Sequence, residues 1–150
     1  MIGKYFYRNN RLVLTDQAHI EIENISYMYG FGVYETMKVR KGTLYFVEQH
    51  VERFLFSARM IELEHQYTDQ QIIEAVRLVV SENQLDAANI KMLLVGGETP
   101  SDAELLILPL SPFFPDRKLY RKGAAVISAP YERYLPQAKT LNMLPSYLFY

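Results

Sequence analysis

The chain has 150 residues, 49% of them hydrophobic, which is enough apolar material for one domain with its own core. Its formal net charge of −1 indicates neither nucleic acid nor an anionic membrane surface as a partner. Cysteine is absent, which excludes disulfides and thiol nucleophiles, and no apolar run approaches the ~20 residues of a membrane span. The N-terminus also lacks a signal-peptide core, so we expect a cytoplasmic protein without a membrane or metal partner.

The N-terminal part of the chain predicts two hairpins. Residues 4–7 and 11–14 are short strand-like pieces around Arg8-Asn9-Asn10, where asparagine tolerates the positive φ of a tight turn. After a polar loop, residues 32–39 alternate in polarity, and a Lys41-Gly42 turn leads to a strand over residues 43–47. One face of the longer strand carries Val33, Glu35, Met37 and Val39.

Two amphipathic helices are predicted next. Over residues 47–63 the apolar side chains recur every three or four positions, which gives one buried stripe. Thr68-Asp69-Gln70-Gln71 fits a capping box, and the helix that it opens is expected to end near Asn83.

After the two helices, the spacing of the apolar residues changes from that of helices to that of strands. Residues 90–95, 104–110 and 124–129 are short apolar runs separated by Gly or Pro signals, and each predicts a strand. The second run lacks alternation, so we expect it in the centre of the sheet with both faces covered. The fold class predicted from these elements is α+β.

A Pro-bounded stretch over residues 130–136 breaks the strand pattern. We therefore expect one α+β domain over residues 1–130, and an interdomain connection with the start of a truncated second domain over residues 131–150. The aromatic cluster over residues 147–150 supports this division, because so apolar a segment usually packs against something.

Arg53 and Lys139 are the residues that suggest chemistry. Arg53 lies beside the apolar stripe of its helix, with His50 and Ser57 on the same flank, and a guanidinium at the edge of a core suits a phosphate. The alternative is an exposed ion pair with Glu52 or a neighbour of Glu48. Lys139 follows the Pro-bounded connection, where a partly desolvated amine could condense with an aldehyde; the alternative is a solvated loop lysine.

Three motifs in register carry a family resemblance. Tyr29-Gly30-Phe31-Gly32-Val33-Tyr34-Glu35-Thr36, His50-Val51-Glu52-Arg53-Phe54 and Ala138-Lys139-Thr140-Leu141-Asn142 resemble the class IV aminotransferases. These fold-type IV pyridoxal-phosphate enzymes include D-amino-acid aminotransferase, branched-chain aminotransferase and aminodeoxychorismate lyase. The resemblance covers essentially the whole chain and implies their N-terminal domain, an antiparallel or mixed sheet with two main helices packed on it.

The resemblance implies a role for each matched residue. Lys139 matches the lysine that forms the aldimine with pyridoxal 5'-phosphate and then carries the proton. Arg53 matches the arginine on the cofactor phosphate, Asn142 follows the lysine in the cofactor-binding motif, and Tyr34 matches an aromatic position on the substrate side. The implied reaction moves an amino group from an amino acid to a 2-oxo acid, and the implied assembly is a homodimer.

The sequence also departs from the family pattern. Phe31 stands where the family often has Asp, and Gly96-Gly97 stands where D-amino-acid aminotransferase has an arginine for the substrate carboxylate. Members of the family are about twice as long, so the second domain is expected to be missing. Two alternatives to an aminotransferase therefore stay open: a lyase of the same family that acts on aminodeoxychorismate, and a non-catalytic fragment or dimerisation module.

Overall fold

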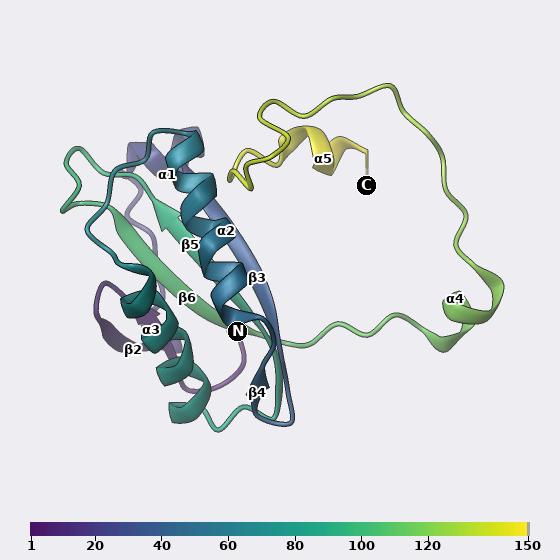
Figure 1. Ribbon diagram of the computed structural model, residues 1–150, viewed down its shortest axis with the longest axis horizontal. Helices are drawn as coiled ribbons and strands as arrows, with labels where there is room; N and C mark the ends of the chain where they lie inside the picture. Colours follow the sequence, from purple (N-terminus) through teal and green to yellow (C-terminus); the bar gives the residue numbers. More distant parts are fainter. Residues whose placement is uncertain (150) are drawn as a thin grey trace.

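The structure, a computed structural model, describes residues 1–149 and consists of one antiparallel sheet with two long helices on one face (Figure 1). The strand order is β2-β1-β6-β5-β3-β4. The elements are, in chain order, β1 Tyr5–Arg8, β2 Arg11–Leu14, the 3-10 turn η1 Thr15–Gln17, α1 Ile25–Tyr29, β3 Gly32–Arg40, β4 Thr43–Leu44, α2 Val47–Met60, α3 Asp69–Glu82, β5 Ala87–Val95, β6 Glu104–Leu110, α4 Arg117–Lys122 and α5 Leu144–Leu148.

The first hairpin is confirmed. Asn9 and Asn10 both have positive φ, 47° and 66°, the combination that a two-residue turn between twisted strands requires. The strand predicted over residues 43–47 is shorter than expected, because β4 ends at Leu44 and Phe46 already caps α2 with a φ of 54°.

Both long helices are confirmed, with one difference in length. The α2 helix ends at Met60 instead of residue 63, because Glu62 adopts a φ of 55° and turns the chain. The Leu63 N–H then donates to the Ala58 carbonyl (3.0 Å) and the Glu62 N–H to the Arg59 carbonyl (3.1 Å), which is a Schellman motif. The capping box of α3 is present as predicted at Thr68 and Gln71.

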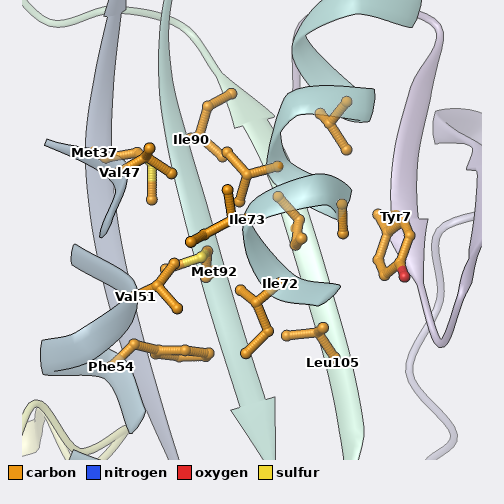
Figure 2. Close-up of a cluster of buried hydrophobic side chains, with 14 of the residues drawn as sticks. Tyr7, Met37, Val47, Val51, Phe54, Ile72, Ile73, Ile90, Met92 and Leu105 are labelled. Carbon is orange, nitrogen blue, oxygen red and sulfur yellow. The ribbon is translucent and has the colours of Figure 1, made fainter. Parts of the chain in front are cut away.

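The core lies between the helix pair and one face of the sheet (Figure 2). Phe54 of α2 and Ile72 of α3 are fully buried there against Met92 and Leu105 of β5 and β6. The β6 strand is central, as expected, with β1 on one edge and β5 on the other. Its second face is covered only in part, since Leu106 is buried but Leu108 is half-buried.

The strand predicted over residues 124–129 is wrong. This stretch has no strand partner within residues 1–149, and Val126 and Ile127 are 87% and 93% exposed. A β-branched run forms a strand only beside another backbone, and both edges of the preceding strand β6 are already paired. The chain instead runs away from the sheet after Leu110 and comes back near α5 (Figure 1).

No helix among residues 1–149 is long and apolar enough to cross a bilayer.

Candidate active site

The free edge of β3 positions Lys139. The short strand β4 pairs only with the far end of β3, at Val39 and Arg40, and so leaves the edge near Gly32 open. The returning chain fills this edge: the Tyr34 N–H donates to the Lys139 carbonyl (2.8 Å) and the Leu141 N–H donates to the Gly32 carbonyl (2.9 Å). Lys139 is therefore held by sheet-like hydrogen bonds, and it is half-buried rather than solvated on a loop.

Ser57 joins this segment to α2. Its side chain is fully buried, and its Oγ accepts a hydrogen bond from the Lys139 N–H (3.2 Å) while donating to the Arg53 carbonyl (2.9 Å). One hydroxyl thus links the backbones of Arg53 and Lys139, which are far apart in the sequence. The only sequence signal for this contact was that Ser57 lies four residues after Arg53 on the same helix flank.

A buried carboxylate orients Arg53. Arg53 donates from Nε to Glu35 Oε2 and from Nη2 to Glu35 Oε1 (2.9 Å), and the Glu35 side chain is 1% exposed. His50 Nδ1 lies 3.4 Å from the same carboxylate, which also accepts the Thr36 N–H (2.8 Å). The ion pair expected as the alternative, with Glu52 or a neighbour of Glu48, is wrong, because the partner comes from β3 and not from the helix.

The pKa values of Glu35 and Arg53 are set by burial and by the groups that each of them contacts. Burial alone raises the pKa of Glu35, but hydrogen bonds from Arg53 and Thr36 and the positive charge of Arg53 outweigh it and lower that pKa overall. The hydrogen bond to Glu35 raises the pKa of Arg53. The Arg53 side chain is still 52% exposed, so a fixed guanidinium faces solvent and can receive an anion.

Tyr34 lies on the other face of β3 from Glu35, since alternate residues of a strand point to opposite faces. The Lys139 Nζ is 4.5 Å from the centroid of its ring. The Tyr34 hydroxyl donates to the sulfur of Met143 (3.5 Å). The structure thus brings Tyr34, Arg53 and Lys139 together around the edge of β3.

Asn142 is not part of this group and lines a neighbouring cavity. The cavity has a volume of about 480 Å³, and Tyr34, Arg53 and Lys139 do not line it. Its wall includes Tyr29, Glu62, Tyr131, Arg133, Tyr134 and Asn142. The sequence signalled this cavity only through its density of aromatic residues.

Residues 32–150 match the family model of amino-transferase class IV. The chain belongs to the class IV aminotransferases. The D-alanine aminotransferase of Staphylococcus epidermidis is 33% identical over 104 residues, which are 69% of this chain and 37% of that protein. The D-alanine aminotransferase of Listeria monocytogenes is 30% identical over 89 residues, which are 59% of this chain and 31% of that protein. This class IV chain therefore spans between 31% and 37% of the length of these relatives.

Solved branched-chain aminotransferases have the same fold. The enzyme from Escherichia coli superposes with a TM-score of 0.67 at 19% identity, over 73% of this chain and 41% of that one. The enzyme from Thermoproteus uzoniensis, whose structure was solved with norvaline, gives a TM-score of 0.65 at 24% identity, over 73% and 41%. A further branched-chain aminotransferase, solved with pyridoxamine 5'-phosphate, gives a TM-score of 0.69 at 19% identity, over 77% and 42%. At such identities the likeness establishes the fold, and it confirms the predicted α+β class.

The two departures from the class IV pattern lie against each other. The Gly96 N–H donates to the Phe31 carbonyl (3.0 Å), and the Phe31 ring occupies the position that a Cβ at residue 96 would take. A side chain at residue 96 therefore requires the ring to move. Phe31 and Gly96 form one packed unit at the end of β5.

Proposed function

We propose that this chain carries the lysine and the phosphate-binding arginine of a pyridoxal-phosphate-dependent aminotransferase, which moves an amino group from an amino acid to a 2-oxo acid. The observation that carries the proposal is the Ser57 hydroxyl, which holds Lys139 and Arg53 in one hydrogen-bonded unit. A phosphate needs a fixed cationic donor and the cofactor aldehyde needs a nearby amine, and this unit supplies both.

Each residue then has a part in the reaction. Pyridoxal phosphate, when bound, supplies the electron sink for the substrate carbon. Arg53, oriented by Glu35, would bind the phosphate through its exposed guanidinium edge. Lys139 Nζ would hold the cofactor covalently and then move the proton, while Tyr34 forms the wall beneath that nitrogen on the substrate side. Asn142 would support the backbone that follows the lysine.

The assembly is also part of the proposal. Residues 1–130 would form the N-terminal domain, and residues from 131 onward the interdomain connection and the first part of a cofactor-binding second domain. No residue from 111 to 139 belongs to a strand, which supports a connecting segment in this part of the chain. Exposed aromatic and aliphatic side chains after Leu110, among them Tyr134, Tyr147 and Leu148, support burial against further protein, for which a homodimer in the cytoplasm is our proposal.

Borohydride trapping tests the proposal without an activity assay. The chain is incubated with pyridoxal phosphate, reduced, and analysed by intact mass and peptide mapping. We expect one reduced cofactor per chain on Lys139, loss of that label in Lys139→Ala, and a wild-type label in the control Lys118→Ala, whose lysine lies on the exposed helix α4. A label scattered over many lysines, or an undiminished label in Lys139→Ala, would refute the assignment.

A further inference from the structure

His50 contacts both members of the Glu35–Arg53 pair, and the proposed function gives it no role. It lies one helical turn before Arg53 on α2, and its side chain is 21% exposed. Its Nδ1 is 3.4 Å from Glu35 Oε1 and 3.5 Å from Arg53 Nη2. One ring nitrogen thus faces a carboxylate, which only accepts hydrogen bonds, and a guanidinium, which only donates them. The hydrogen bonds already made by these two groups decide whether that nitrogen is a donor or an acceptor.

The carboxylate oxygen that faces His50 already has its hydrogen bonds. Glu35 Oε1 accepts from Arg53 Nη2 (2.9 Å) and from the Thr36 N–H (2.8 Å). Each oxygen of an ionised carboxylate has about two lone-pair sites, so these two donors fill Oε1. A hydrogen on His50 Nδ1 would have to displace one of them, although both are closer to the oxygen than His50 is. The carboxylate therefore leaves no acceptor site for a hydrogen on Nδ1.

Arg53 Nη2, in contrast, has a hydrogen left to donate. Each terminal nitrogen of a guanidinium carries two hydrogens, and Glu35 takes one of those on Nη2. A neutral imidazole with its hydrogen on Nε2 has a lone pair on Nδ1, which can accept the other. Nε and both hydrogens of Nη2 are then engaged. Among residues 1–149 Nη1 has no hydrogen-bond partner, and the Arg53 side chain is 52% exposed.

We propose that His50, as its Nε2–H tautomer, is a positioning residue that leaves Nη1 of Arg53 as the donor to the cofactor phosphate. The inference rests on the proposed function, which assigns Arg53 to that phosphate. Glu35 alone fixes the plane of the guanidinium but leaves one hydrogen of Nη2 free to bind an oxygen from a second direction. His50 occupies this hydrogen, so the phosphate meets the guanidinium at Nη1 and takes one position. A single position of the phosphate matters because it sets where the rest of the cofactor lies relative to Lys139.

Nitrogen-15 NMR of the three histidine rings tests the tautomer directly. His65 is an internal reference, because its Nδ1 accepts the Tyr67 N–H (3.1 Å) and therefore carries no hydrogen. At about pH 8, where model imidazoles are neutral, we expect the Nδ1 of His50 to resonate with that of His65, in the range of a ring nitrogen without hydrogen. A His50 Nδ1 signal in the range of a protonated nitrogen would overturn the proposal.

The orientation of Arg53 is measured through its two Nη signals, which rotation about the Nε–Cζ bond exchanges. His50→Leu removes the acceptor and should speed this exchange by about 3-fold to 10-fold, the range for one hydrogen bond. His50→Asn should keep the wild-type rate, because its Oδ1 can accept in place of Nδ1. The control His19→Leu removes an imidazole that is 63% exposed and should also match wild type. Equal rates in His50→Leu and wild type would show that His50 does not orient Arg53.

Phosphate binding gives a readout that a merely structural role would not change. When inorganic phosphate is added to wild type, the Nη1 signal of Arg53 should shift and the Nη2 signal should stay nearly constant, whereas both should shift in His50→Leu. In calorimetry His50→Leu should bind pyridoxal phosphate about 3-fold to 10-fold more weakly and bind pyridoxal, which has no phosphate, as wild type does. Equal shifts of both Nη signals in wild type, or equal losses for the two cofactor forms, would overturn the role of His50.

This inference and the proposed function fail in different ways. A borohydride label on Lys139 together with a hydrogen on His50 Nδ1 would overturn the role of His50 and leave the proposed function standing. Inorganic phosphate bound at Nη1 of Arg53 together with an unlabelled Lys139 would refute the transamination proposal and leave the role of His50 standing.

Discussion

Replacing Glu35 by Gln tests whether the buried carboxylate positions Arg53. The substitution keeps the shape of the side chain but removes the charge that accepts hydrogen bonds from Arg53 Nε, Arg53 Nη2 and the Thr36 N–H. Each charged hydrogen bond contributes about 1.5–3 kcal/mol. Desolvation of the carboxylate offsets part of that, and Arg53 is 52% exposed and can be rehydrated. We therefore expect the free energy of unfolding to fall by about 2 kcal/mol at pH 7.

The lowered pKa of Glu35 also predicts how the loss of stability in Glu35→Gln depends on pH. The folded pKa of Glu35 is below its ordinary value of 4.5, so its contribution is present above pH 4.5 and is lost as the pH falls through the folded pKa. The difference between wild type and Glu35→Gln, measured by urea unfolding, should hold from pH 7 to pH 5 and shrink below pH 4.5. The control Glu48→Gln removes a carboxylate whose partner Arg77 is more than half exposed, and should cost about 0.5 kcal/mol or less. A loss below 0.5 kcal/mol for Glu35→Gln, or one that grows towards low pH, would contradict this reasoning.

Two more substitutions probe the contacts around the site. Ser57→Ala should make the Lys139 amide exchange its hydrogen about 3-fold to 10-fold faster, because one hydrogen bond of about 1 kcal/mol is lost. Ser81→Ala on α3 is the matched control, because it removes a serine hydroxyl that bonds only within its own helix. Equal exchange rates of the Lys139 amide in the two variants would show that Ser57 does not hold the segment. Gly96→Ala should destabilise the chain by about 1–3 kcal/mol in thermal unfolding, because the new Cβ meets the Phe31 ring, and adding Phe31→Ala should restore part of the loss. A neutral Gly96→Ala would mean that the ring moves away freely.

The local sequence pattern was enough to predict the elements whose stabilising contacts lie close together in the sequence. The capping box at Thr68, the Asn9-Asn10 turn and the stripe of α2 depend on neighbours a few residues away, and each is found where the sequence predicts it. The early end of α2 at Met60 was missed because Glu62, and not a glycine, turns the chain. The residues of the candidate site could also be named from three short motifs, since their spacing along the chain is itself a pattern.

Only the tertiary structure decided how those residues meet. Arg53 could pair with any nearby acid, and the choice of Glu35 depends on α2 packing over the face of β3 that carries it. The docking of Lys139 required β4 to be short enough to leave an edge open, and residues 124–129 had strand composition but no edge to join. Strand pairing and buried ion pairs depend on which surfaces remain unfilled once the rest of the chain has folded, and that is a property of the whole arrangement rather than of any local sequence.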